Sequence, residues 1–335
     1  MADPLRRWAA ERASGVSLRA EEEAVAALRD ALVAEALASR RRANPEPERP
    51  RHEAAPRPEP PPAQETGATA LWTYGVVPSD APAVSGLRGV DPAHPVSPVR
   101  SGGLTALASR VPLDEFGAEP LRNNLNDLEW LERVARAHEA VLERALQAAT
   151  CVPLRLCTIY ESEESLREML DRERAAFTEA LELLAGKQEW SVKLLVDGAA
   201  LAAAARELSD ELAGLEDDAR GRSEAGAYML QRRIDRHVRE RADALATQTV
   251  DEIHARLAAW AVDAITRPPQ NRELSGHEGE MLLNGAYLVE ADRIEGLREL
   301  VAELERDYGA LGARLDLSGP WPPYNFVPGD TGMAP

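Results

Sequence analysis

The stretch EWSVKLLVD, residues 189–197, alternates valine and leucine with polar residues and predicts a β-strand. The elements expected after it are, in order, two helical segments at about residues 200–217 and 226–266, a short extended piece at about 270–275, a strand at 280–290, a helix at 292–308 and a strand at 313–319. Pro268 and Pro269 are expected to end the second helical segment, because proline cannot continue a helix. Read along the chain, the series is β-α-β-β-α-β.

This order is that of a ferredoxin-like unit, in which helices cover an antiparallel sheet. The two helical segments stand where such a unit has its first helix, and the polar stretch EDDARGRSEAG separates them. At 1.5 Å per residue the longer segment extends about 60 Å, more than a small sheet can cover. We therefore predict a ferredoxin-like C-terminal domain at residues 188–327, with a helical hairpin at about 200–266 that projects from it and contacts other proteins.

The preceding residues also mix strands and helices. The elements expected there are a strand at residues 72–77 (WTYGVV), a hairpin within 94–112 that turns at Ser101-Gly102-Gly103, a helix at 127–148, a strand at 152–160 and a helix at 163–185. We predict an N-terminal α+β domain at residues 71–187. The expected fold class is α+β, with two α/β domains.

The two ends of the chain have a different composition. Residues 1–42 predict a charged helix with a thin apolar stripe. Residues 43–70 are rich in proline and charge and contain no aliphatic residue larger than alanine, so they predict a disordered linker. Residues 328–335 are expected to form a flexible tail.

Charge and composition limit the classes of partner. The formal net charge is −18, which argues against nucleic acid and against an anionic membrane surface and favours a basic partner or a solvated acidic surface. No apolar run is long enough for a membrane-spanning helix, and the N-terminus lacks a signal-peptide pattern.

Cys151 and Cys157 would lie about 20 Å apart on one strand, too far for a disulfide. Reduced thiols indicate a cytoplasmic protein.

The sequence offers no convincing catalytic, cofactor-binding or metal-binding site. Its six histidines do not pair at ligand spacing, and His138 lies on an apolar helical face, where a packed core residue is the simpler interpretation. Glu189 and Lys193 share one face of a strand, which suits a structural ion pair or a solvated face. Phosphate-loop and dinucleotide patterns are missing.

Aromatic residues gather near the C-terminus, in a chain that is only 4% aromatic. Trp321, Tyr324 and Phe326 stand among prolines in GPWPPYNFV, residues 319–327. The prolines remove backbone donors and stiffen the path. Two interpretations remain open: the rings fold back over the sheet and hold the C-terminus, or at least one ring is presented to a partner, as aromatic hot spots are.

The motif SGPWPPYNFV at the end of this strand order resembles the gas vesicle accessory proteins of the GvpL/GvpF family. Further segments are similar to that family over about residues 71–327: YGVV (74–77), RSGGLTALASRVP (100–112), VPLRLCTIYESEESL (152–166) and LAGKQEWSVKLLVD (184–197). Leu156 and Cys157 depart from the Phe-Gly pair that the family tends to have.

The resemblance implies a non-enzymatic role in forming gas vesicles, in the cytoplasm or on the vesicle. Its implied partners are the small hydrophobic wall protein and other gas vesicle accessory proteins, and it implies no cofactor. Two alternatives from other classes remain: a generic coiled-coil adaptor, and an enzyme on a ferredoxin-like scaffold. A cleft holding clustered ionisable groups with shifted pKa values would favour the enzyme.

Overall fold

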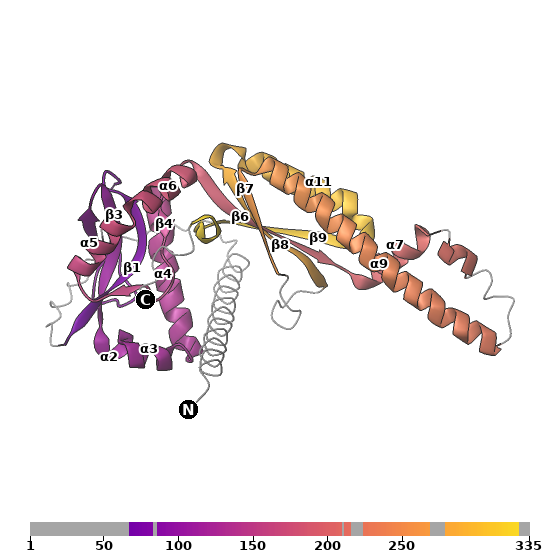
Figure 1. The fold of residues 1–335 in the computed structure, drawn as a ribbon, viewed down its shortest axis with the longest axis horizontal. Coiled ribbons are helices and arrows are strands. Elements are labelled where there is room, and N and C mark those ends of the chain that lie inside the picture. Colours follow the sequence, from indigo (N-terminus) through magenta and orange to yellow (C-terminus); the bar gives the residue numbers. More distant parts are fainter. Residues whose placement is uncertain (1–66, 83–85, 210, 216–223, 269–278, 328–335) are drawn as a thin grey trace, which may run out of the picture.

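The computed structural model describes residues 67–82, 86–209, 211–215, 224–268 and 279–327 of the chain. The predicted helix at residues 1–42, most of the predicted linker at 43–70 and the predicted tail at 328–335 lie outside these residues. The described chain mixes helices with two antiparallel sheets, which lie one after the other along the long axis of the molecule (Figure 1).

The first sheet has the strand order β2-β3-β1-β4, with β5 also paired to β1. Its strands are β1 (Thr69–Pro78), β2 (Ser97–Ser101), β3 (Leu104–Pro112), β4 (Val152–Pro153) and β5 (Ile159–Tyr160). The predicted hairpin is confirmed, because β2 and β3 pair around Gly102 and Gly103, whose positive φ angles suit glycine. β1 begins at Thr69, three residues before the strand predicted at residues 72–77.

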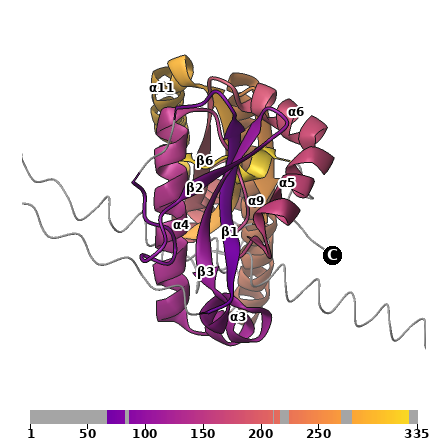
Figure 2. The same ribbon diagram turned by 90° about the vertical axis from the view of Figure 1, so that its left-hand side faces the viewer.

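Helices cover both faces of this sheet (Figure 2). They are α2 (Leu113–Phe116), α3 (Ala118–Asn124), α4 (Leu128–Ala148), α5 (Glu163–Arg172) and α6 (Arg174–Leu184). The helix predicted at residues 127–148 is confirmed as α4, and its predicted apolar face is buried except for Leu128, which is exposed. Asp127 starts it by accepting hydrogen bonds from the amides of Glu129 and Trp130.

Two predictions in this half are wrong in detail. The strand expected at residues 152–160 is interrupted, because a turn closed by a hydrogen bond from the Thr158 amide to the Arg155 carbonyl separates β4 from β5. The helix expected at 163–185 breaks at Glu173, where the run Asp171–Arg174 interrupts the apolar spacing. The break allows α5 and α6 to bury separate apolar faces against the sheet.

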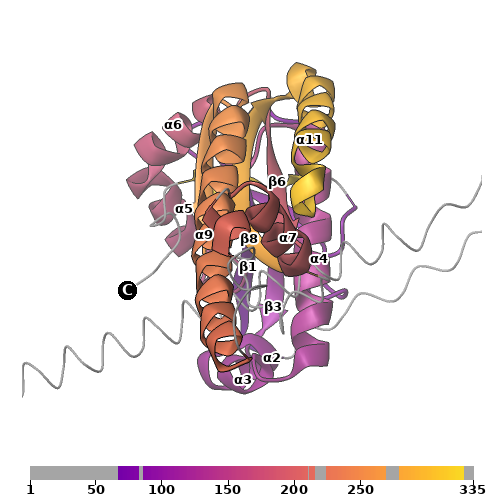
Figure 3. The same ribbon diagram turned by 90° about the vertical axis from the view of Figure 1, so that its right-hand side faces the viewer.

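The second sheet has the strand order β7-β8-β6-β9, and all its pairs are antiparallel. Its strands are β6 (Lys187–Val196), β7 (Asp263–Arg267), β8 (Glu280–Glu290) and β9 (Ala313–Trp321). The helices of this half are α7 (Gly198–Glu207), α9 (Glu224–Trp260) and α11 (Ile294–Tyr308), with short 3₁₀ turns at Ala291–Arg293, Gly309–Leu311 and Tyr324–Phe326. α9 and α11 lie over one face of the sheet (Figure 3).

The predicted ends of the helical segments need correction. α9 ends at Trp260 and not at the prolines, because the Val262 amide bonds to the Leu288 carbonyl and β7 then pairs with β8. Pairing along a sheet edge outweighs the helical preference of the alanines in this stretch. The strand expected at residues 270–275 lies outside the described residues. The segment expected as one helix at 200–217 is interrupted after Glu207, since the Ser209 side chain accepts from the Leu212 amide and starts a new turn.

The apolar cores show how the two halves are joined. One cluster includes Val76 and Phe177 from the first half together with Ala286, Leu288 and Phe326 from the second, so the two sheets share a core. A second cluster lies between the first sheet and α4. A third lies between the second sheet, α11 and the C-terminal half of α9.

The N-terminal half of α9 belongs to a separate, smaller cluster. Ile234 and Val238 of this half pack with Leu212 and not with either sheet. This half of α9 extends past the end of the second sheet (Figure 1). We call residues 228–241 of α9 the arm.

Candidate functional site

The C-terminal aromatic segment leaves the edge strand β9 and reaches back to the first half of the molecule. We call residues Trp321–Val327 the clasp. The Tyr324 hydroxyl donates to Glu139 Oε1 of α4 over 2.9 Å. The Phe326 ring is buried in the core cluster that the two sheets share. The clasp therefore connects elements of both halves.

A buried carboxylate fixes the middle of the clasp. Glu189 of β6 is only 4% exposed, and it accepts hydrogen bonds from the backbone amide and the side-chain amide of Asn325. The Arg267 guanidinium of β7 donates to Asn325 Oδ1. A buried carboxylate needs such donors, because an unpaired charge in the interior is costly.

The three predicted site residues therefore differ in their surroundings. Phe326 is buried, which matches the interpretation that the segment folds back. Trp321 and Tyr324 are half-buried, and the Trp321 indole donates to Ser318 Oγ. The structure brings the three together on one short path, but their rings have separate contacts.

Glu189 and Asn325 were not singled out as a pair by the sequence. Glu189 was expected on a solvated face or in an ion pair with Lys193, whereas it is buried under the clasp. The two residues are 136 positions apart in sequence, so local spacing carries no signal for their contact. The remaining clue was Asn325 itself, a polar residue between two aromatics.

His138 is a core residue, as its apolar helical face predicted. Its Nδ1 accepts from the Trp72 indole over 3.0 Å, which places its proton on Nε2, 3.1 Å from the Leu154 carbonyl. Within the described ranges, histidine, cysteine and carboxylate side chains form no group that could hold a metal ion.

The clearest raised pKa values arise from burial in the core. Burial raises the pKa of the Cys151 thiol to about 12 and that of the Tyr74 hydroxyl to about 12. Tyr74 also contacts Ser109 and accepts from the Val90 amide. Tyr308 differs, because its pKa is raised to about 12 mainly by its hydrogen bond to Glu252.

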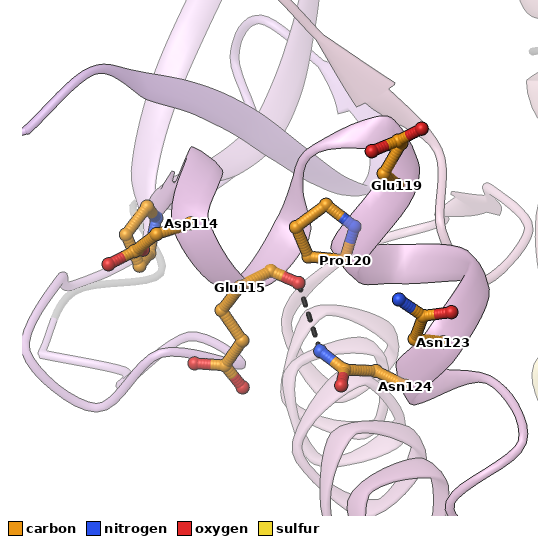
Figure 4. A pocket seen from close by; sticks show the side chains of 7 residues that line it. Asp114, Glu115, Glu119, Pro120, Asn123 and Asn124 are labelled. Atoms are coloured by element: carbon orange, nitrogen blue, oxygen red, sulfur yellow. Dashed lines mark hydrogen bonds between the residues drawn. The ribbon is translucent and has the colours of Figure 1, made fainter.

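An open acidic hollow lies between α2 and α3 (Figure 4). Asp114, Glu115 and Glu119 line it, and Asn124 Nδ2 donates to the Glu115 carbonyl. The Glu115 carboxylate is bound by the Trp130 indole over 2.7 Å and by Arg133 over 2.8 Å. These contacts hold α2 and α3 against α4, so the hollow is explained by packing.

Cys157 occupies a backbone conformation that favours glycine. Its φ angle is +66°, in the left-handed region, where a Cβ atom is strained. This is the position at which the sequence departs from the Phe-Gly pair. The departure leaves the turn between β4 and β5 in place.

The described residues thus form a two-sheet α+β protein whose distinctive features are a clasp and a projecting arm. The chain belongs to the gas vesicle synthesis protein GvpL/GvpF family, whose model matches residues 70–328. It is 36% identical over 254 residues to gas vesicle protein L of Streptomyces sp. (strain CB03234), an alignment that covers 76% of this chain and 88% of the relative. It is 25% identical over 227 residues to gas vesicle protein F of Nostoc sp. (strain PCC 7120), an alignment that covers 66% of this chain and 83% of that relative.

Solved structures show the same fold at lower identity. The crystal structure of GvpF from Anabaena sp. PCC7120 matches with a TM-score of 0.59 and 22% identity, over 77% of this chain and 98% of that one. GvpF from Microcystis aeruginosa matches with a TM-score of 0.54, also at 22% identity and over the same shares. The family supports a role in gas vesicle assembly. In the part of the chain that the structure describes, no helix has the length and apolar character needed to cross a bilayer.

Proposed function

We propose that the protein is a non-enzymatic accessory factor of gas vesicle assembly that binds the small hydrophobic wall protein or other gas vesicle proteins, in the cytoplasm and on the vesicle. The family match over residues 70–328 carries this proposal. A wall protein must expose apolar surface before assembly, and such surface aggregates. An acidic accessory factor with a net charge of −18 keeps a bound complex dispersed.

We also propose that the second half is a ferredoxin-like domain with an inserted helical hairpin. The strand order β7-β8-β6-β9 and the element order support the ferredoxin-like assignment. The packing of α7 against α9, and the separate cluster around Ile234 and Val238, support the hairpin. The proposed domains are residues 71–187 and 188–327, with apolar residues of both in one shared cluster.

Partner binding at the clasp is assigned to its half-buried rings. Phe326 is committed to the core, so Trp321 and Tyr324 are the rings available for contact. Tryptophan is enriched at binding hot spots, so the half-buried Trp321 is the ring that we test first. The arm supplies a second surface away from both sheets.

Co-purification tests the proposal. The tagged chain is expressed together with the wall protein in four versions: unaltered, with residues 208–238 replaced by a glycine-serine linker, with Trp321→Ala, and with Leu128→Ala as a matched control. Leu128 is an exposed apolar residue of α4, 65% exposed and far from the clasp in sequence. We expect capture by the unaltered chain and the control, and weaker capture by one or both of the other versions. A folded, unaltered chain that captures no gas vesicle protein would overturn the proposal.

A further inference from the structure

The arm carries a concentration of positive charge in a strongly acidic chain. Five arginines lie between residues 232 and 241, beside only two carboxylates. All five, Arg232, Arg233, Arg236, Arg239 and Arg241, are exposed. Among the described residues none of them forms an ion pair, whereas arginines of α4, α5 and the C-terminal half of α9 do.

Three of these arginines form a straight stripe with Tyr228. Residues four and three positions apart lie on one helical face, so Arg232, Arg236 and Arg239 follow Tyr228 along α9. Ile234 and Val238 point to the opposite side, where they pack with Leu212. The stripe therefore faces solvent, and from Tyr228 to Arg239 it is about 17 Å long at 1.5 Å per residue.

The stripe is not explained by the stability of α9. Like charges at this spacing weaken a helix, and the two nearby carboxylates, Asp235 and Glu240, contact Gln231 and His237 rather than the arginines. The Arg232 guanidinium lies over the Tyr228 ring at 5.9 Å, and the neighbouring Met229 is 69% exposed. The stripe thus combines unpaired cations with apolar surface at one end, a combination typical of a protein-binding surface.

We propose that the arginine stripe of the arm docks an acidic amphipathic helix of a partner protein. Carboxylates at the same spacing on a helix laid along the arm would meet Arg232, Arg236 and Arg239, and arginine binds carboxylates through paired donors. The stripe ends at Asp243, one turn beyond Arg239, which limits the match to about three turns. A nucleic acid or an anionic membrane carries negative charge over a longer distance than the stripe. It would therefore also approach the acidic remainder of the chain, which repels it.

This surface goes beyond recognition of the hydrophobic wall protein, because its chemistry selects carboxylates. The two proposals can fail separately. If the chain fails to capture the wall protein, its arm can still bind carboxylates. If the arm fails to bind carboxylates, the clasp can still bind the wall protein.

The test measures binding of synthetic probes to the full chain at low and physiological salt. The probes are an amphipathic peptide of about three helical turns with glutamates at the stripe spacing, the same peptide with lysines, a short DNA duplex, and vesicles of phosphatidylcholine and phosphatidylglycerol. The proteins are the unaltered chain, the variant R232E/R236E/R239E, and the control R100E/R155E/R314E. The control changes the net charge equally at exposed arginines of other elements.

We expect the arm variant to bind the glutamate peptide at least about tenfold more weakly and to gain affinity for the lysine peptide, since favourable pairs become like-charge contacts. The affinity of the control for the glutamate peptide should stay within about twofold of that of the unaltered chain, because charges far from the arm are screened by salt. The neutral variant R232Q/R236Q/R239Q, with helicity checked by circular dichroism, replaces the charge reversal if that variant unfolds. Equal affinity of arm variant and control for the glutamate peptide would overturn the proposal. So would DNA or vesicles binding more tightly than the peptide through the same arginines.

Discussion

Replacing Phe326 by alanine should destabilise the whole protein, although the residue lies close to the chain end. The ring is 6% exposed and packs in the cluster that contains residues of both sheets. Cutting a buried phenylalanine to alanine costs about 3–5 kcal/mol, and the lower value applies here because the site lies near the protein surface and can partly collapse or admit water. A loss of about 3 kcal/mol corresponds to a fall in Tm of roughly 6–12 °C for a protein of this size.

Thermal and guanidinium unfolding, followed by circular dichroism, measure this loss. Phe326→Leu is the matched control, because an apolar replacement of similar size should cost less than about 1.5 kcal/mol. Since the cluster joins the two halves, the melting curve should move as a whole. If Phe326→Ala and Phe326→Leu both have the same Tm as the unaltered protein, the clasp does not hold the two sheets together and our description of it is wrong.

Three further predictions concern the first half. Cys157→Gly should raise the free energy of unfolding by about 0.5–1 kcal/mol in urea titrations, because glycine relieves the left-handed strain, and no gain would show that the thiol contacts outweigh it. Gly75→Ala should cost about 1–3 kcal/mol, since a Cβ there would lie 2.6 Å from Cys151 Sγ and 2.9 Å from the Val152 carbonyl, and unchanged melting would contradict this. Because burial raises the Cys151 pKa to about 12, its thiolate should be scarce at neutral pH, so iodoacetamide should label the half-buried Cys157 first by mass spectrometry.

Periodic patterns in the sequence predicted much of the secondary structure. Apolar residues at helical spacing after the N-cap residue Asp127 predicted α4. The glycine pair predicted the turn of the β2–β3 hairpin. Such features depend on neighbours within a few residues. The end of α9 at Trp260 does not, because the pairing of β7 with a strand far along the chain decides it.

The site was less predictable for the same reason. The aromatic clustering drew attention to Trp321, Tyr324 and Phe326, but their partners, Glu139 among them, lie far away in sequence. The arginines of the arm are close together in the sequence. The net charge of −18 describes the whole chain, however, and gives no sign of this local positive cluster. The packing of Ile234 and the exposure of the arginines show that the stripe faces solvent.

Vesicle formation in a heterologous host tests the central claim most directly. The host carries a complete set of gas vesicle genes, with this chain as its member of the GvpL/GvpF family, and vesicles are counted by electron microscopy with the chain present, omitted, or replaced by its arm variant R232E/R236E/R239E. We expect vesicles only when a chain with an intact arm is present. Vesicles of normal number and shape in the absence of the chain would contradict its role in assembly.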